Sequence, residues 1–178
     1  IPNLAKDQLV AELLQISPDA IDLEPMLREP LPGAHSRTRA FIKVQDGCDN
    51  RCTFCITTVA RGPGRSRTVS AVLSDINNAL AGGTQEIVLT GVHLGSWGID
   101  LNQPSNLTSL VRSILDETNL PRLRLSSLEP WQIDEEFLAL WKDPRLCPHL
   151  HLPLQSGCKA TLRRMARNIT PAEYTWLV

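Results

Sequence analysis

Three of the chain's five cysteines, Cys48, Cys52 and Cys55, lie within eight residues. Their spacing is Cys-x3-Cys-x2-Cys, and Gly47 before them lets the backbone turn tightly around a bulky inorganic group. A structural zinc site is closed by four ligands, whereas an iron–sulfur cube held by three thiolates leaves one iron without a protein ligand. The number and type of these residues therefore favour an iron–sulfur cluster with one iron open to a further ligand.

Zinc at the same cysteines stays open as an alternative. A zinc ion needs a distant fourth ligand, for which the sequence offers His35, His93 and Cys147. A disulfide framework is disfavoured, because the number of cysteines is odd and residues as close as Cys52 and Cys55 rarely serve one. The cysteine usage therefore favours a reducing cytosol.

Composition and charge limit the classes of protein to which the chain can belong. At 178 residues, 42% hydrophobic and 21% charged, the chain is long enough for one globular domain with a sizeable core. It contains no run near the roughly 18 apolar residues of a membrane helix and no secretory leader, so we expect a cytoplasmic protein without a membrane partner. The net charge is only −1, yet acids are absent from 50–74 and 158–171, which carry four basic residues each. These two basic stretches favour an anionic partner.

The elements that position the cysteines follow from the hydrophobic pattern. Residues 4–16 are predicted as a helix and 17–39 as a linker, so we expect the end of a preceding domain in 1–39 and an organised domain in 40–178. In that domain strands and helices alternate. Strands are predicted at 41–45, 86–91, 122–127 and 149–155, and helices at 69–81, 107–118, 134–142 and 160–166.

Repeated βα units form a parallel sheet with right-handed crossovers, either open or closing toward a barrel. Ligands gather at the carboxyl ends of such strands, and the sequence places its unusual residues there. The cysteine loop follows the first strand, and the later strands are followed by Thr90–His93, Ser126–Pro130 and Gln155–Gly157. We therefore expect these segments to meet at one edge of the sheet.

The segment GCDNRCTFC resembles the cluster loop of the radical S-adenosylmethionine superfamily, in which an aromatic residue, here Phe54, precedes the third cysteine. The segments ARGPGRSR, LTGVHLGSWGIDL, RLRLSSLEP and HLHLPLQSGCKATLRRM, in that order, resemble its methylthiotransferases. The resemblance runs from about Ala40 to the end of the chain. It is greatest to the branch that modifies N6-threonylcarbamoyladenosine at position 37 of tRNA. One departure is Thr57-Thr58, which stands where the family has a proline after the third cysteine.

The resemblance implies an α/β fold, a partial (β/α)6 radical-SAM barrel that is open and contains about four βα units. It implies a [4Fe–4S] cluster at Cys48, Cys52 and Cys55, and S-adenosylmethionine at the open iron. The residues that it places near the cofactor or the nucleoside are Phe54, Thr90, Gly91, Gln155 and Ser156. The basic arm after the cysteines could contact tRNA phosphates or help to close the cofactor site, through Arg61, Arg65 and Arg67.

The implied activity is methylthiolation of carbon 2 of the modified adenosine in the tRNA anticodon loop, through reductive cleavage of S-adenosylmethionine. It requires an electron donor. The resemblance also implies an N-terminal auxiliary-cluster domain and a C-terminal RNA-binding module that this chain lacks, so we expect a fragment that is not competent alone. Three alternatives stay open: an enzyme of the same family acting on isopentenyladenosine tRNA or a ribosomal protein, a radical enzyme of the same superfamily acting on a protein or small molecule, and a non-catalytic metal-stabilised RNA-binding module.

Overall fold

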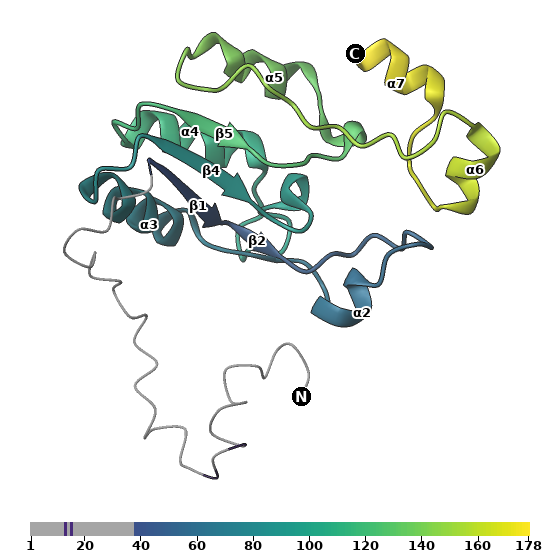
Figure 1. The fold of residues 1–178 in the computed structure, drawn as a ribbon, viewed down its shortest axis with the longest axis horizontal. Helices are drawn as coiled ribbons and strands as arrows, with labels where there is room; N and C mark the ends of the chain where they lie inside the picture. The colour runs from purple at the N-terminus through teal and green to yellow at the C-terminus, as the bar shows by residue number, and fades with distance from the viewer. Residues whose placement is uncertain (1–12, 14, 16–37) are drawn as a thin grey trace.

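The computed structural model describes residues 13, 15 and 38–178 (Figure 1). Apart from residues 13 and 15, the predicted helix at 4–16 lies outside the described residues, and so does the predicted linker at 17–39 up to residue 37. Among the residues that are described, no helix is long and apolar enough to cross a membrane.

A three-stranded parallel sheet organises the domain, in the order β1–β4–β5 (Figure 1). Strand β1 spans Arg39–Lys43, β4 spans Glu86–Thr90 and β5 spans Leu123–Leu125. β1 and β4 pair from Arg39 opposite Glu86 to Lys43 opposite Thr90. Because the strands are parallel, their carboxyl ends lie at one edge of the sheet, and the cysteine loop follows from this edge.

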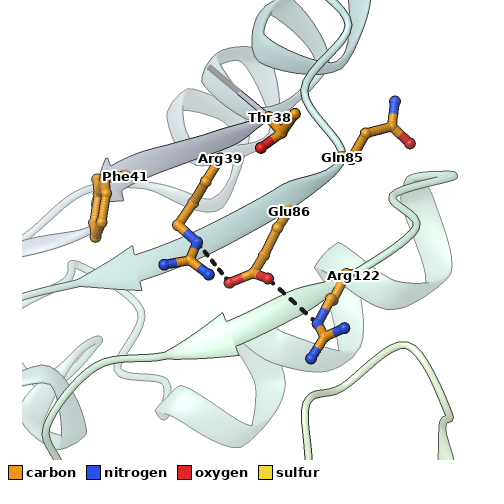
Figure 2. Close-up of a pocket in the computed structure, with 6 residues that line it drawn as sticks. All are labelled: Thr38, Arg39, Phe41, Gln85, Glu86 and Arg122. Atoms are coloured by element: carbon orange, nitrogen blue, oxygen red, sulfur yellow. Dashed lines mark ion pairs between the residues drawn. The ribbon is translucent and has the colours of Figure 1, made fainter.

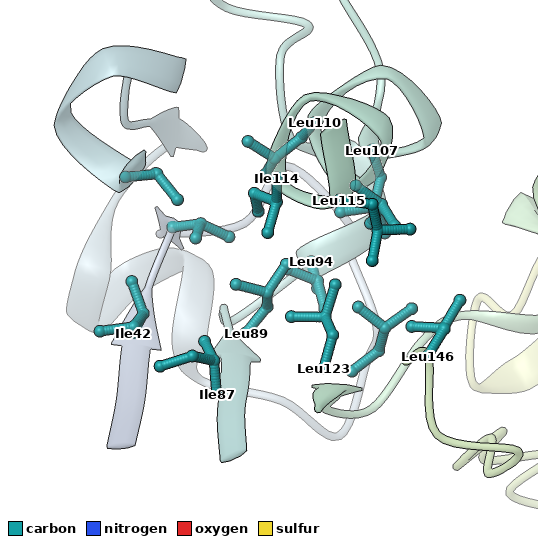
Figure 3. Close-up of a cluster of buried hydrophobic side chains, with 14 of the residues drawn as sticks. Ile42, Ile87, Leu89, Leu94, Leu107, Leu110, Ile114, Leu115, Leu123 and Leu146 are labelled. Atoms are coloured by element: carbon teal, nitrogen blue, oxygen red, sulfur yellow. The ribbon is translucent and has the colours of Figure 1, made fainter. Parts of the chain in front are cut away.

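One face of the sheet is covered by α3, Val69–Ala81, and α4, Leu107–Glu117. Alternate strand residues point to this face because the side-chain period of a strand is two. They pack in one cluster with the apolar stripes of both helices (Figure 3), and its fully buried members include Ile87, Leu89, Leu123, Val72, Ile76, Leu110 and Ile114. Each helix begins at a side-chain cap, Thr68 for α3 and Asn106 for α4.

The opposite face of the sheet carries polar and charged side chains at the alternate positions. Glu86, on the central strand, lies between Arg39 and Arg122 (Figure 2). It also accepts from Arg124 at 2.8 Å. Arg39, Glu86, Arg122 and Phe41, which is 64% exposed, border a pocket of about 560 Å³ near the amino ends of the strands. The sheet is therefore covered on one side, as in an open barrel.

The predicted fourth strand at 149–155 is wrong in this structure. Only two isolated parallel bridges extend the sheet beyond β5, Leu123 to Leu146 and Ser127 to His151. Pro148 and Pro153 lack the backbone N–H that a strand ladder needs, which explains why the segment stays extended without pairing along its length. The described residues thus form three βα units followed by an extended segment.

The remaining helices are short. The predicted helix at 134–142 is divided into α5, Glu135–Leu138, and a 3-10 turn η5, Ala139–Lys142. The predicted helix at 160–166 is α6, Lys159–Arg164. A final helix α7, Pro171–Leu177, begins at a capping box in which Thr170 and Glu173 bond each other's backbone N–H groups.

The sequence pattern did not predict the small elements that surround the cysteines. Strand β2, Gln45–Asp46, pairs antiparallel with β3, Arg65–Ser66, and α2, Thr57–Arg61, lies between them in the chain. Two further 3-10 turns, η3 at Leu94–Ser96 and η4 at Pro130–Gln132, follow β4 and β5 at the same edge of the sheet. These elements are too short to show a hydrophobic period.

Candidate functional site

The loop that carries the cysteines begins at the end of β2, where two buried side chains hold it. Gln45 donates from its side-chain amide to the carbonyl oxygens of Asp46 at 3.1 Å and Gly47 at 2.9 Å. Gly47 has φ +73°, and a Cβ on it would lie 1.9 Å from the carbonyl oxygen of Pro63. The predicted need for glycine here is therefore steric, because only glycine fits both this conformation and this contact.

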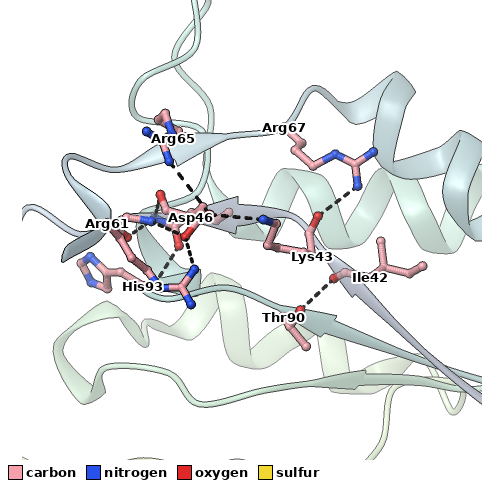
Figure 4. Close-up of polar contacts among 10 residues, drawn as sticks. Ile42, Lys43, Asp46, Arg61, Arg65, Arg67, Thr90 and His93 are labelled. Atoms are coloured by element: carbon pink, nitrogen blue, oxygen red, sulfur yellow. Dashed lines mark hydrogen bonds and ion pairs between the residues drawn. The ribbon is translucent and has the colours of Figure 1, made fainter. Parts of the chain in front are cut away.

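Asp46 joins the start of the cysteine loop to the basic arm that follows it. Its carboxylate accepts from the backbone N–H of Gly47 at 2.9 Å and from Arg61 at 3.0 Å, and it lies 3.9 Å from Arg65 (Figure 4). Burial alone raises the pKa of Asp46, but the bonds from Lys43, Gly47 and Arg61 outweigh it and hold the pKa at about 2. Asp46 is therefore a permanent anion that keeps the arm against the loop.

The three cysteines lie on one loop between β2 and α2. Cys48 and Cys52 are half-buried, and Cys55 is exposed. The pKa of Cys48 is raised by burial first and then by the charges of Cys52 and Cys55, so the three thiols interact electrostatically. The pKa of Cys55 is lowered by its hydrogen bonds with the side chain and backbone of Thr57, at the start of α2, and the Cys55 thiol lies 3.1 Å from the Thr57 hydroxyl.

The donor set fits a cluster better than a zinc ion. Within residues 13, 15 and 38–178, no three His, Cys, Asp or Glu side chains converge so as to hold one metal ion. A zinc ion draws four ligands to about 2.0–2.3 Å from a single point. A cluster takes one thiolate per iron, so its ligands stay further apart and face the cube from one side. Three interacting thiols on one loop match the second pattern.

Thr90 and Gly91 lie at the end of β4, beside the start of the cysteine loop. The hydroxyl of Thr90 donates to the carbonyl oxygen of Ile42 at 3.3 Å, across the β1–β4 pair (Figure 4). A Cβ on Gly91 would lie 3.1 Å from the side chain of Gln45. Both residues thus contribute to packing at the strand end, and their predicted role toward the cofactor stays a prediction.

The other residues predicted to contact cofactor or nucleoside lie on exposed or half-buried loop segments. Phe54 is 50% exposed on the cysteine loop. Gln155 is exposed with φ +75°, an unusual conformation for a residue with a side chain. Ser156 accepts from the backbone N–H of Cys158 at 3.1 Å, just before α6. Their side chains therefore remain on the surface in this structure, and their binding roles are not tested by it.

The three arginines of the basic arm, Arg61, Arg65 and Arg67, differ in the groups that they contact. The side chain of Arg61 is 50% exposed and that of Arg65 is 35% exposed, and both face Asp46. Arg67 instead bonds Asp75 on α3 at 2.6 Å and the carbonyl oxygens of Lys43 and Ala71. Arg61 and Arg65 are thus at the site, whereas Arg67 ties the arm to the scaffold.

The sequence pattern did not single out the polar network behind the cysteine loop. The Nε2 atom of His93 lies 2.7 Å from the amide nitrogen of Gln132 and 3.3 Å from that of Asn50. Burial lowers the pKa of His93 more than nearby charges, Glu129 first, raise it. The Nδ1 atom of His93 is buried and has no hydrogen-bond partner among the described residues. Through Nε2, His93 links the loops after β2, β4 and β5.

A buried arginine completes this edge of the sheet. Arg167 follows α6, and its guanidinium bonds Glu129 after β5 and the carbonyl oxygen of Pro153. It also stacks over the ring of Trp131, 4.5 Å from its centroid. Two signals in the sequence pointed to this region separately, the segment Ser126–Pro130 and the basic stretch 158–171, but no pattern paired them.

Residues 42–178 match the Radical SAM superfamily. The chain is 43% identical over 131 residues to a putative methylthiotransferase of Helicobacter pylori, covering 74% of this chain and 31% of that relative. It is 40% identical over 144 residues to the threonylcarbamoyladenosine tRNA methylthiotransferase MtaB of Thermotoga maritima, covering 80% and 33%. It is 37% identical over 145 residues to a tRNA-2-methylthio-N(6)-dimethylallyladenosine synthase of Lawsonia intracellularis, covering 78% and 32%.

The chain thus spans about a third of the length of these curated relatives. Among solved structures, it is similar in fold to the radical S-adenosylmethionine methyltransferase TsrM of Kitasatospora setae, with cobalamin and a [4Fe-4S] cluster bound. The TM-score is 0.61 at 19% identity, over 78% of this chain and 27% of TsrM. For the cobalamin-dependent radical enzyme OxsB, the TM-score is 0.62 at 16% identity, over 77% of this chain and 21% of OxsB. The open α/β sheet, the three-cysteine loop at its carboxyl edge and the match over 42–178 agree: the chain belongs to the radical SAM superfamily.

Proposed function

We propose that residues 40–178 form the cluster-binding core of a cytoplasmic tRNA methylthiotransferase. The observation that carries the proposal is the loop from Cys48 to Cys55, which carries three free thiols within eight residues at the carboxyl edge of a parallel sheet, in a chain of this superfamily. Cys48, Cys52 and Cys55 are the proposed ligands of a [4Fe–4S] cluster. The relatives at 37–43% identity are named as methylthiotransferases or as a methylthio-adenosine synthase, which supports the activity.

When bound, a [4Fe–4S] cluster supplies one-electron cleavage of S-adenosylmethionine, and the protein supplies binding, orientation and exclusion of water. In this proposal, Thr90 and Gly91 bring the end of β4 close to the methionine part of the cofactor. Phe54 covers the exposed side of the loop. Gln155 and Ser156, on the segment before α6, lie toward the nucleoside. Gln45 and Asp46 hold the loop in place from behind.

The proposed substrate is N6-threonylcarbamoyladenosine at position 37 of tRNA, modified at carbon 2. The relatives support both this nucleoside and the dimethylallyl-type adenosine as substrates of the group. The segments TGVHLG and LSSLEP favour the first, and dimethylallyl-type adenosine is the second candidate. Arg61 and Arg65 are the proposed contacts to phosphates of the anticodon loop, because they place two guanidinium groups beside the cysteine loop.

The full reaction also needs an electron donor and the parts of the relatives that this chain does not span. The test therefore uses the full-length protein, reconstituted with iron and sulfide without oxygen. We expect about four iron atoms bound at this site, cleavage of S-adenosylmethionine by a reductant, and methylthiolation of tRNA carrying N6-threonylcarbamoyladenosine. Conversion of only dimethylallyl-type tRNA would move the substrate to the second candidate.

A matched pair of variants tests the ligand assignment. Cys52→Ala should abolish cleavage of S-adenosylmethionine, whereas Cys158→Ala, exposed at the start of α6, should leave it unchanged. Retained cleavage in Cys52→Ala contradicts the three-thiolate site. Stoichiometric zinc uptake by the native protein, with no colour after iron and sulfide are added, would instead support the non-catalytic metal-stabilised module.

A further inference from the structure

Arg167 is an arginine whose side chain is almost fully buried, with 2% of its surface exposed. One terminal nitrogen, Nη2, donates to the carboxylate of Glu129 and to the carbonyl oxygen of Pro153. The other, Nη1, faces the sulfur of Cys52 at 4.0 Å. Nε is buried and, among the described residues, has no hydrogen-bond partner. The guanidinium therefore directs Nη1 at Cys52 and keeps one further buried donor, Nε, without a partner among the described residues.

The backbone is bent to place this side chain. Helix α6 ends at Arg164, and Ala166 adopts φ +53°, a conformation that residues with a side chain rarely take. Arg167 then bonds back from its N–H to the carbonyl oxygen of Leu162 at 3.0 Å. Such a turn without glycine carries strain, which the surrounding contacts must offset.

The same turn holds the cysteine loop directly. The hydroxyl of Thr53 donates to the carbonyl oxygen of Arg164 at 2.8 Å, and its N–H donates to that of Met165 at 3.3 Å. Thr53 is the neighbour of Cys52 in the chain, so these bonds fix the distance between Cys52 and Arg167. The guanidinium is thus held at a set place beside one of the proposed cluster ligands.

A guanidinium stays charged at all physiological pH values, and a charge away from water acts strongly on its neighbours. Glu129 carries the opposite charge at the same place, because its carboxylate accepts a hydrogen bond from Nη2 of Arg167. We propose that Arg167 and Glu129 form a charge pair that sets the reduction potential of the cluster held by Cys48, Cys52 and Cys55. Arg167 is a positioning residue in this role, since it acts through Cys52. The inference rests on the cluster site proposed above.

The electron balance is simple. One electron from sodium dithionite adds one negative charge to a cluster at these cysteines, and no covalent bond forms or breaks. A fixed positive charge beside Cys52 favours the reduced state, and a fixed negative charge opposes it. Removing the arginine charge should therefore make reduction harder, and removing the glutamate charge should make it easier.

The experiment is a reduction titration followed by electron paramagnetic resonance, on the reconstituted full-length protein. Only the signal that changes on addition of S-adenosylmethionine is followed, so that any other cluster is left out. We expect Arg167→Met to lower the equilibrium constant for reduction about tenfold, which for one electron is 59 mV. Arg167→Lys, which keeps the charge, should change it much less. Arg163→Met, on the exposed surface of α6, is the matched control and should leave it unchanged.

Glu129→Gln provides the second, opposite test. It keeps the size of the side chain and removes the negative charge, so the equilibrium constant for reduction should rise. If Arg167 and Glu129 had only a structural role, Arg167→Met and Glu129→Gln would shift the equilibrium constant for reduction in the same direction. That result overturns the proposal. If Arg167→Met fails to assemble a cluster, an unchanged or lowered constant in Glu129→Gln overturns it equally.

Failure of the cluster site itself gives a different result. In that case the native protein binds no iron through these cysteines, and Cys52→Ala takes up as much iron as the native protein. An intact cluster with four iron atoms in Arg167→Met and an unchanged potential would reject only the role of Arg167.

Discussion

The side-chain carbonyl oxygen of Gln45 accepts a hydrogen bond from the backbone N–H of His93 at 2.8 Å. Through this bond the end of β2 is joined to the loop after β4, while the amide nitrogen of the same side chain holds Asp46 and Gly47. Gln45 is 1% exposed, so it is a buried polar residue with all of its bonds made inside the protein. It connects two loops of the candidate site.

Replacement of Gln45 by leucine should destabilise the domain. The size of the side chain is nearly kept, but three buried backbone groups lose their partners, each costing about 1–3 kcal/mol. We expect the free energy of unfolding to fall by about 3 kcal/mol or more, measured by urea denaturation. Gln85→Leu is the control, since Gln85 is exposed and, among the described residues, its side chain bonds only the nearby Gly83 carbonyl. Equal stability of the two variants would contradict the bracing role of Gln45.

Two glycines in and beside the cysteine loop allow the cost of a positive φ to be distinguished from the cost of a steric clash. Gly47 and Gly62 both have positive φ, +73° and +76°. A Cβ on Gly62 meets nothing within 4 Å, whereas one on Gly47 collides with the carbonyl oxygen of Pro63 at 1.9 Å. Gly62 has ψ −164°, which places it in a region that is almost exclusive to glycine, so Gly62→Ala should cost about 1–3 kcal/mol, the cost of the backbone conformation alone. Gly47→Ala should lower the free energy of unfolding clearly more, as measured by urea denaturation, and should reduce iron uptake after reconstitution, as measured by iron analysis. Equal effects of the two variants would contradict the steric role of Gly47.

The central layer of the fold was predictable from the sequence, because its strands and helices are long enough to show a period. The predicted helix at 69–81 is α3 with the same bounds, and the strand predicted at 86–91 is β4, Glu86–Thr90. The strand predicted at 149–155 was wrong because an apolar alternating segment still needs N–H donors and a neighbour, and Pro148 precedes this segment while Pro153 interrupts it.

The candidate site was predictable only in part. The cysteines can be recognised in the sequence by their type and spacing. The contact of Arg167 with Cys52, in contrast, joins residues 115 positions apart. No local pattern encodes such a contact, and an arginine in a basic stretch is more often solvated than buried. The same holds for His93 and Gln132, whose bond joins the ends of two different strands.

Stability should depend on pH through Glu86. Burial raises the pKa of this carboxyl, but the bond from Arg124 and the charges of Arg124 and Arg39 lower it more, so the net pKa lies below its usual 4.5. A carboxylate with a lowered pKa in the folded state stabilises the fold above its unfolded pKa, and this contribution is lost as the pH falls through the folded pKa. Glu86→Gln should therefore be less stable than the native chain at pH 7. The difference should shrink on going from pH 4.5 to lower pH in urea denaturation series, and a constant difference across this range would exclude the assignment.

Arg65 provides the test of the basic arm. Its side chain is 35% exposed beside Asp46, and it is proposed to contact tRNA phosphate. Arg65→Ala should weaken binding of tRNA and make the dependence on salt shallower, by about 0.7–0.9 in the slope of log affinity against log salt for one lost phosphate contact. The measurement is a series of binding titrations at increasing salt with the full-length protein. Arg112→Ala is the control, because Arg112 lies on α4 and pairs with Glu136 away from the cysteine loop. Cleavage of S-adenosylmethionine should persist in Arg65→Ala, since the cysteines keep their place; its loss, with tRNA affinity unchanged, would assign the arm to the cofactor site instead.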